Sequence, residues 1–212
     1  MLPQQDPTDL LILVNKTNKA PAVPVTLVKP NVQPTRESAS ENIYMRPEAA
    51  AALEALFAGA AEDGLTLYAT SGYRSYSTQK AIFKRKLDRM SEKQANLSVA
   101  KPGYSEHQTG LAMDIEGETT KGTGLTEAFG ESPEGIWAAE PCAEYGFIIR
   151  YPKDKTKITG YIYEPWHLRY VGREAAQEIT ALDVTFEEYI AMVRSDRIQW
   201  LQEETQYDKQ NP

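Results

Sequence analysis

Residues 103–115 read GYSEHQTGLAMDI and contain His107, one of only two histidines in the 212-residue chain. Asp114 follows seven residues later, in the middle of an apolar stretch. In a fully extended chain the two side chains would lie about 23 Å apart, so a common site requires the chain to reverse its direction. Gly110 permits such a reversal next to Thr109, and residues 111–115 then read as a strand that leaves the turn.

The second histidine, His167, lies in the segment EPWH at residues 164–167. Glu164 precedes it by three residues. Pro165 disrupts the regular alternation of a strand, so the side chains of Glu164 and His167 can face one cleft. Asp114 has apolar neighbours, and a buried carboxylate needs an ion pair, hydrogen bonds or a metal ion.

Two histidines, one aspartate and a separate glutamate are the groups that a hydrolytic zinc site uses. Zinc in hydrolases takes three protein ligands of these types and keeps a fourth position for water. A carboxylate that does not bind the metal then accepts a proton from the water and returns it to the leaving amine. Taken alone, residues 103–115 also allow a plainer interpretation, in which Asp114 caps a turn and His107 is an exposed loop residue.

Four ordered motifs carry a family resemblance: SGYRS at residues 71–75, GYSEHQTGLAMDI at 103–115, GF to RYP across 146–152, and EPWHLRYVG at 164–172. Together they resemble the zinc D-alanyl-D-alanine carboxypeptidase family of the vancomycin-resistance type. The resemblance covers about residues 65–172 and, more weakly, residues 11–16.

The resemblance implies the Hedgehog/D,D-peptidase fold, an α+β domain with a small antiparallel sheet, flanking helices and an open zinc cleft. It also implies that His107, Asp114 and His167 bind Zn²⁺ and that Glu164 is the catalytic base. Arg74, in the SGYRS motif, is then expected to face the active site as a catalytic and substrate-binding residue. There a guanidinium can hold a substrate carboxylate or stabilise a developing oxyanion, although a surface arginine after a strand is the plainer alternative.

Three further residues occupy positions that line the peptide site in related enzymes and are expected to bind substrate through hydrogen bonds: Gln79, Ser105 and Tyr151. Ser105 could equally form a turn, and Tyr151 could equally pack as a core aromatic residue. Trp166 is expected to form a wall of the site or part of the core.

Three acids close to these motifs are not expected to react: Glu106, Glu116 and Glu118. They are expected to lie in solvent or to support the metal ligands from behind. Glu116 is close enough to Asp114 in the sequence to be a rival ligand.

The remaining pattern predicts one α+β domain, because 212 residues with 41% hydrophobic content suit one core and are short for two. The predicted division is an N-terminal strand and proline-rich wrapping segment at 1–40, a zinc D,D-carboxypeptidase domain at 41–205 and a polar tail at 206–212. Predicted strands span 10–14, 65–70, 111–115, 147–150 and 167–171, with hairpin-sized links between the late strands. Predicted helices span 47–62, 77–92, a segment from Ser132 to Gly146 that Pro141 divides, and a C-terminal part that begins with a Thr185–Glu188 capping box.

Charge, cysteine content and the length of apolar runs exclude several classes of protein. A formal net charge of -7 and a pI near 5.0 argue against a protein that holds nucleic acid through phosphate contacts. The densest basic run, Lys84 to Lys86, is expected to form a solvated helix face. The single cysteine, Cys142, excludes an internal disulfide and a cysteine-based zinc cluster, and is expected to be buried and inert. The apolar run Leu10 to Val14 is too short to span a membrane or to form a signal-peptide core, so no membrane-spanning segment is expected.

These features predict a zinc-dependent carboxypeptidase that hydrolyses the terminal D-alanine of peptidoglycan stem peptides ending in D-Ala-D-Ala. Within the same fold, an L,D-carboxypeptidase and a D-Ala-D-Ala dipeptidase remain alternatives. A non-catalytic zinc-fold binding module is an alternative from another class, and Glu164 argues against it because a structural site needs no spare base. The expected partner is a stem peptide ending in D-alanine, and the expected location is the bacterial cell envelope outside the cytoplasm, with a cytoplasmic location left open.

Overall fold

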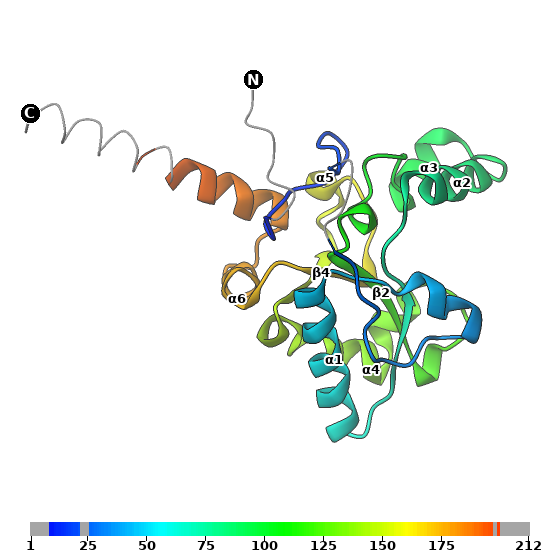
Figure 1. Ribbon diagram of the computed structural model, residues 1–212. Coiled ribbons are helices and arrows are strands. Elements are labelled where there is room, and N and C mark those ends of the chain that lie inside the picture. The colour runs from blue at the N-terminus through cyan, green and yellow to red at the C-terminus, as the bar shows by residue number, and fades with distance from the viewer. Residues whose placement is uncertain (1–8, 22–25, 197–198, 200–212) are drawn as a thin grey trace, which may run out of the picture.

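A four-stranded antiparallel sheet forms the centre of the computed structural model, which describes residues 9–21, 26–196 and 199 (Figure 1). In spatial order, its strands are β1 (Leu67–Ser71), β2 (Ala112–Gly117), β4 (Glu164–Tyr170) and β3 (Phe147–Tyr151). Every neighbouring pair is antiparallel, and the predicted single α+β domain is confirmed. The tail predicted at residues 206–212 lies outside the described residues.

Helices surround this sheet: α1 (Pro47–Glu62), α2 (Tyr76–Leu87), α3 (Glu92–Ser98), α4 (Pro133–Ala139), α5 (Thr156–Thr159) and α6 (Arg173–Ala181). Short 3-10 helices are η1 (Glu37–Asn42), η2 (Glu106–Thr109), η3 (Glu118–Thr120), η4 (Glu127–Glu131) and η5 (Cys142–Tyr145). Residues 186–196 are also helical. None of the helices in the described part of the chain combines the length and the apolar character that crossing a membrane requires.

The main hydrophobic core lies where α1 and α4 cover the sheet (Figure 1). Leu53 and Leu56 of α1 are fully buried in the same core as Met113 and Ile115 of β2. Replacing such a leucine by alanine typically costs about 2–5 kcal/mol. Because successive side chains of a strand point to opposite faces, Asp114 points away from this core.

Several predicted boundaries are confirmed. Pro47 is the first residue of α1, where its missing N–H is not needed, and Gly64 follows the helix with a φ of 76°. Pro141 separates α4 from η5, as expected for a residue that cannot continue a helix. Thr185 and Glu188 form the predicted capping box, since the Glu188 carboxylate accepts from the Thr185 N–H at 2.8 Å.

Residues 10–14 are not the predicted strand. Ile12 and Val14 are nevertheless buried in the main core. The carbonyl oxygens of Leu10 and Ile12 instead accept hydrogen bonds from the Nη2 of Arg169, at 2.8 and 2.9 Å. A guanidinium therefore satisfies this backbone where a neighbouring strand was expected.

The helix predicted at 77–92 is two helices, α2 and α3, that pack as a hairpin at one edge of the molecule (Figure 1). Ser91 and Gln94 form a capping box, with the Gln94 Oε1 accepting from the Ser91 N–H at 3.2 Å. A capping box starts a new helix, so the chain turns between Leu87 and Glu92.

The link between the last two strands is also longer than the hairpin that was predicted. Residues 152–163 separate β3 from β4 and include α5. Strand β4 begins at Glu164 rather than at His167, and the register of the β3–β4 pair shifts between Ile149 and Tyr151. This irregularity lies opposite Glu164, at the end of the sheet where the predicted site residues gather.

Candidate active site

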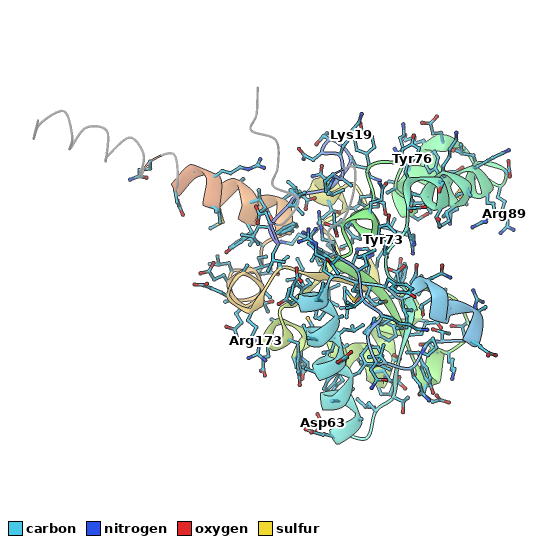
Figure 2. All side chains as sticks on the ribbon, in the orientation of Figure 1. Lys19, Asp63, Tyr73, Tyr76, Arg89 and Arg173 are labelled. Atoms are coloured by element: carbon cyan, nitrogen blue, oxygen red, sulfur yellow. The ribbon has the colours of Figure 1, made fainter. Side chains whose placement is uncertain are left out.

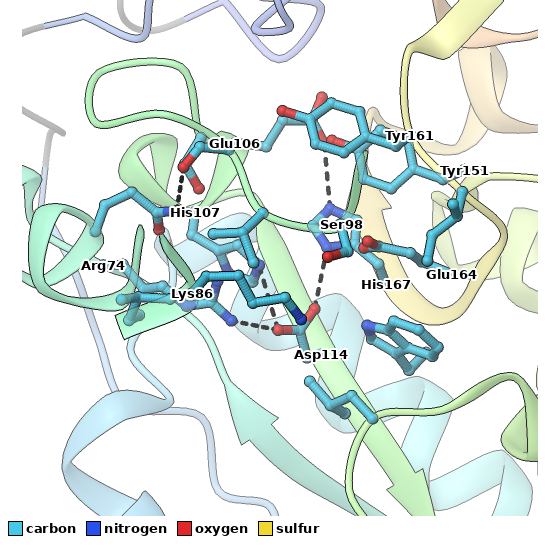
Figure 3. A pocket seen from close by; sticks show the side chains of 18 residues that line it. Arg74, Lys86, Ser98, Glu106, His107, Asp114, Tyr151, Tyr161, Glu164 and His167 are labelled. Atoms are coloured by element: carbon cyan, nitrogen blue, oxygen red, sulfur yellow. Dashed lines mark hydrogen bonds and ion pairs between the residues drawn. The ribbon is translucent and has the colours of Figure 1, made fainter. Parts of the chain in front are cut away.

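The two central strands and η2 bring the three predicted metal ligands together (Figure 3). Asp114 on β2 lies directly opposite His167 on β4 in the strand register. His107 lies on η2, and Gly110 has a φ of 72°, which confirms the predicted reversal beside it. One donor atom from each of His107, Asp114 and His167 lies within 4.8 Å of the other two.

Hydrogen bonds behind the two imidazoles fix which nitrogen faces the cluster. The Nδ1 of His107 lies 2.7 Å from the carbonyl oxygen of Gly72, which can only accept, so Nδ1 carries the hydrogen. The free Nε2 of His107 is then 3.3 Å from the Oδ2 of Asp114. His167 is turned the other way: its Nδ1 is 3.0 Å from the Oδ1 of Asp114, and its Nε2 is 3.3 Å from the Oε2 of Glu106.

This arrangement fits a zinc ion. Tetrahedral Zn–N and Zn–O bonds of about 2.1 Å place ligand atoms on the order of 3.4 Å apart. The Nδ1 of His167 lies 3.0 Å from the Oδ1 of Asp114 and the Nε2 of His107 lies 3.3 Å from its Oδ2, so each imidazole is at about this spacing from one of the two carboxylate oxygens. Each imidazole is also oriented from behind by an acceptor, as metal-binding histidines usually are.

The electrostatics of the cluster favour a bound cation. Burial alone would raise the pKa of Asp114, but the neighbouring His107 and Arg74 hold it well below its usual value, so Asp114 is ionised. Burial and the charge of Arg74 lower the pKa of His107 to about 4. Burial also opposes the charge on His167, yet its hydrogen bonds to Asp114 and Glu106 raise its pKa to about 9. Two carboxylates therefore face one imidazole, which is a setting that stabilises positive charge.

Glu164 differs from the other acids of the cleft. Burial, helped by the negative charge of Asp114, raises the pKa of Glu164 to about 8, although His167 and Arg74 act in the opposite direction. Glu164 and His167 line the same cleft, as the proline between them led us to expect. In Figure 3, dashed lines connect Asp114 with His107 and His167, and none of the dashed lines drawn between these residues reaches Glu164.

Glu106, which was expected to lie in solvent or to support the metal ligands from behind, lies behind His167. Its side chain is fully buried, and its Oε1 accepts from the Nε of Arg150 and the Nη1 of Arg169, each at 2.7 Å. Burial would raise the pKa of Glu106, but the two guanidiniums hold it well below its usual value. The ionised Glu106 therefore accepts from the Nε2 of His167 and fixes the orientation of that ring.

The network behind Glu106 reaches both ends of the described chain. Arg150 donates two hydrogen bonds, at 2.9 and 2.6 Å, to Glu187 in the helical segment 186–196. Arg169 donates to the N-terminal carbonyls described above. The only sequence signals for this network are Glu106 next to His107 and two arginines near the strand motifs, and strand pairing alone brings them together.

The three acids were expected to lie in solvent or to support the metal ligands from behind, and Glu118 and Glu106 each meet one of these two alternatives. Glu106 and Glu116 are both buried, and only Glu118 is exposed. Glu116 pairs with Tyr68 across β1 and β2, and its carboxylate accepts from the Gly122 N–H at 3.5 Å. Because it does not belong to the His107, Asp114 and His167 group, the structure gives no support to Glu116 as a rival ligand.

The cluster lies in a cleft of about 390 Å³ that also holds every predicted substrate-binding residue: Arg74, Gln79, Ser105 and Tyr151. Arg74 donates from Nη2 to the Oδ2 of Asp114 and from Nε to the Oγ of Ser71 at 2.8 Å. It is therefore a cleft residue and not the surface arginine of the alternative interpretation. Trp166 is both a wall of the cleft and a member of the main core.

The other three residues present different groups to the cleft. Gln79 donates from Nε2 to the carbonyl of Ala100 at 2.7 Å, and its buried Oε1 has no hydrogen-bond partner among the described residues. Ser105 precedes η2 without capping it. Tyr151 stacks on His167 and on Tyr161, with ring centroids 4.9 and 4.4 Å apart. Tyr161 was not predicted, and it lines the same cleft.

Solved structures of peptidases share this architecture. The LdcB LD-carboxypeptidase is 49% identical, has a TM-score of 0.82, and the match covers 88% of each chain. VanYB in complex with D-alanine-D-alanine is 36% identical with a TM-score of 0.72, and the match covers 85% of this chain and 97% of VanYB. The vancomycin-resistance D,D-pentapeptidase VanY in complex with Zn(II) is also 36% identical, with a TM-score of 0.70 over 85% and 98% of the two chains. The fold is thus that of the VanY and VanX peptidases.

Sequence comparison narrows this class to one family. The profile of the VanY family, described as D-alanyl-D-alanine carboxypeptidase, matches residues 42–173. The chain belongs to this family. A curated relative, the putative carboxypeptidase YodJ of Bacillus subtilis, is 48% identical over 192 residues, which are 90% of this chain and 70% of YodJ.

Proposed function

We propose that the protein is a zinc-dependent carboxypeptidase that releases the C-terminal D-alanine of peptidoglycan stem peptides ending in D-Ala-D-Ala. The observation that carries this proposal is the convergence of donor atoms from His107, Asp114 and His167 within 4.8 Å, beside a fourth group, Glu164, in the same cleft. Membership of the VanY family supports the class of reaction. The complex of VanYB with D-alanine-D-alanine supports the choice of substrate.

His107, Asp114 and His167 would hold the metal through two imidazole nitrogens and one carboxylate oxygen, a donor set that Zn²⁺ accepts. Bound Zn²⁺ would supply a Lewis acid for the scissile carbonyl and lower the pKa of a water molecule. The Zn(II) complex of the VanY neighbour supports this choice of metal.

Glu164 is the group that moves the proton. It accepts a proton from the attacking water and donates it to the nitrogen of the departing D-alanine. A carboxyl group whose pKa lies near 8 in the buried cleft can both take up and release a proton near neutral pH. A site that only binds its metal requires no such group, so Glu164 favours an enzyme over a binding module.

Arg74 binds negative charge on the substrate. Its guanidinium lies in the cleft next to Asp114 and keeps further N–H groups for a ligand. These N–H groups can hold the terminal carboxylate of the peptide or the negative charge that develops on the scissile carbonyl oxygen.

L,D-carboxypeptidase activity is a second candidate, and one specific observation favours it. The LdcB LD-carboxypeptidase is 49% identical, whereas VanYB is 36% identical. The two activities differ in the configuration of the residue before the scissile bond. A fitted pocket separates such substrates because an inverted side chain points into a wall.

Hydrolysis of three substrates by the zinc-loaded protein tests the proposal. We expect kcat/KM to be highest for a pentapeptide ending in D-Ala-D-Ala, lower for the tetrapeptide and lowest for free D-Ala-D-Ala, and removal of zinc by a chelator to abolish release in every case. A preference for the tetrapeptide assigns the L,D activity, and a preference for the free dipeptide assigns a dipeptidase. Absence of D-alanine release from all three contradicts the proposal.

The proposed location follows from the substrate. Stem peptides of the mature cell wall lie outside the cytoplasmic membrane, so the enzyme acts at the bacterial cell envelope. Fractionation of cells that carry the native gene, followed by immunodetection, tests this location. Recovery of the protein in the cytosol alone contradicts it.

A further inference from the structure

Basic side chains gather around the mouth of the cleft. The segments 15–20, 76–101 and 152–163 contain twelve of the 23 lysines and arginines but only three of the 30 acidic residues. The rest of the chain has the other 11 basic residues and 27 acidic residues. A protein with a net charge of -7 thus combines a strongly positive region with a strongly negative remainder.

These three segments meet in space and form one surface, which we call the basic rim. The N–H of Ile162 donates to the carbonyl of Leu97 at 3.0 Å, which joins residues 152–163 to α3. Lys16 donates to the carbonyl of Asn96 and lies over the ring of Tyr161, with its Nζ 3.2 Å from the centroid. Figure 1 shows α2, α3 and α5 at the same end of the molecule.

The basic rim borders one part of the cleft. Helix α2, residues 98–100 and residues 161–162 all contribute to its lining, including Lys86 of the rim itself. Figure 2 shows Lys19 and Arg89 at this end of the molecule and Asp63 at the opposite end. A polymer that presents a peptide to the cleft from this end of the molecule therefore lies along the positive surface.

Among the residues that the structure describes, most charges of the basic rim form no ion pair with an acidic side chain. Within the described residues, Lys101 pairs with Glu92 at 2.7 Å and Lys155 with Asp183 at 3.9 Å, while Lys16 is half-buried against Tyr161. The other nine form no ion pair inside the described part of the chain, and all except the cleft residue Lys86 are exposed: Lys19, Lys80, Lys84, Arg85, Lys86, Arg89, Lys93, Lys153 and Lys157.

Solubility does not explain this distribution. The acidic remainder already gives the molecule a large net charge, and crowded like charges repel one another within the fold. A concentrated positive surface beside a cleft is favourable when the ligand brings a matching row of negative charges.

We propose that the basic rim docks the enzyme onto the carboxylate-rich polymer that carries its substrate, while the cleft binds one stem peptide. This inference rests on the proposed function, under which each uncleaved stem ends in a free carboxylate. A polymer with many such stems is a polyanion, so stems beside the bound one supply negative charges to the exposed rim. A short soluble peptide occupies only the cleft and gains little from the rim.

A charge-reversal variant tests the docking surface. Lys84→Glu, Arg85→Glu and Arg89→Glu change the exposed end of α2 and the turn after it, and none of the three residues lines the cleft. The matched control carries the same reversals at Arg36, Arg173 and Arg194, outside the basic rim, so the two variants have equal net charge. Both are made in the Glu164→Gln background, and binding to purified peptidoglycan sacculi freed of phosphodiester polymers is measured by co-sedimentation.

We expect about tenfold weaker sedimentation of the rim variant at low salt, with the control within about twofold of the parent. The difference should shrink as sodium chloride shortens the range of the charges. A neutral variant, Lys84→Gln, Arg85→Gln and Arg89→Gln, should lose an intermediate amount of binding to sacculi. This variant replaces the charge-reversal variant in the experiment if the latter does not fold.

Unchanged binding of the rim variants overturns the proposal. So does binding that requires sacculi with their phosphodiester polymers intact, because the partner is then a different polyanion. In the active protein, kcat/KM for the soluble pentapeptide should stay within about twofold, whereas D-alanine release from sacculi should fall with binding. An equal loss on the soluble peptide would show that the rim acts on the peptide in the cleft. If the wild-type protein released no D-alanine from any peptide, the proposed function would be contradicted. The co-sedimentation experiment would still test the docking surface independently.

Discussion

The floor and the rim of the cleft are built in opposite ways. On the floor, β2, β4 and η2 hold a set of buried polar side chains in which His107, Asp114, His167 and Glu106 are tied to one another. On the rim, α2 buries only Gln79 and Phe83 along its length, and its cations are mostly exposed. The floor has one geometry fixed by hydrogen bonds, whereas the rim offers charge without fixed partners.

The difference shows where single substitutions matter. Removing one partner from a buried polar network leaves the others without compensation, which costs several times more than losing an exposed charge. A single substitution on the floor should therefore cause a large loss of metal binding and turnover. A single substitution on the rim should weaken binding to the polymer only slightly, and several such substitutions should have additive effects.

Loss of His167 should have the largest effect. His167→Ala removes a proposed ligand that pairs with Asp114 across the two central strands. We expect metal content well below one ion per chain and a fall in activity on the order of a thousandfold, because both depend on the same nitrogen. Elemental analysis and D-alanine release on one sample measure this, and stoichiometric metal in the variant would show that the ligand set is wrong.

Glu164→Gln should separate catalysis from metal binding. The substitution keeps the size of the side chain and removes the proton acceptor, so metal content should stay near one ion per chain. Activity should fall on the order of a hundredfold or more. Near-normal turnover with normal metal would remove Glu164 from the mechanism.

The same substitution should change the pH dependence of stability in the metal-free protein. Burial raises the pKa of Glu164 from 4.5 to about 8, so the folded state holds this proton more tightly than the unfolded state. The stability of the wild type should fall relative to Glu164→Gln as the pH rises from about 4.5 through 8, because the buried group must then ionise.

Urea unfolding of both proteins in the presence of a chelator measures this difference. At pH 9 the glutamine variant should be more stable by on the order of 5 kcal/mol relative to the difference at pH 4.5, because each pKa unit corresponds to about 1.4 kcal/mol. The buried histidines titrate in both proteins and largely cancel in the comparison. A gap that does not depend on pH would show that Glu164 has an ordinary pKa in the folded state.

Glu106→Gln tests whether the Glu106 carboxylate orients His167 for metal binding. The glutamine side chain has the same shape as glutamate but lacks the negative charge that pairs with Arg150 and Arg169. Its neutral oxygen is also a weaker hydrogen-bond acceptor for the Nε2 of His167. Metal affinity should fall about 10- to 100-fold, measured by competition with a chromophoric chelator. Glu116→Gln, which changes another buried glutamate of the sheet region outside the cluster, should leave the affinity unchanged. Equal losses in both variants would indicate general destabilisation rather than positioning of His167.

The sequence was sufficient for the parts of the floor that depend on local pattern. Gly110 has the left-handed conformation that a reversal next to His107 requires. The strand predicted at residues 111–115 corresponds to β2, and the buried Asp114 has the ion-pair and hydrogen-bond partners that its apolar neighbours led us to expect. Each of these predictions follows from residues close to one another in the chain, where the backbone leaves few conformations.

The rest required partners that are distant in sequence. Glu106 lies 44 residues from Arg150 and 63 residues from Arg169. The pairing of β3 with β4 brings the two arginines close to each other, and the packing of η2 beside the sheet brings Glu106 to them. For the same reason Leu10 and Ile12 looked like part of a strand, because their actual acceptor role depends on Arg169. Apolar alternation does not reveal which polar group will satisfy a buried backbone.

The smallest expected effect belongs to Gln79, where floor and rim meet. Its Oε1 is buried at the cleft without a hydrogen-bond partner among the described residues, and such a group gains a hydrogen bond when a substrate N–H arrives. Gln79→Met keeps the length and removes the acceptor, so KM for the pentapeptide should rise roughly 3- to 10-fold with kcat nearly unchanged, as expected for one neutral hydrogen bond. The substitution also removes the bond from Nε2 to the carbonyl of Ala100. Gln79→Glu is the control, because it removes that donor and keeps an acceptor. If KM rises only in the methionine variant, the lost acceptor explains the effect. If KM rises equally in both variants, the cause is the packing of α2 against residues 98–100.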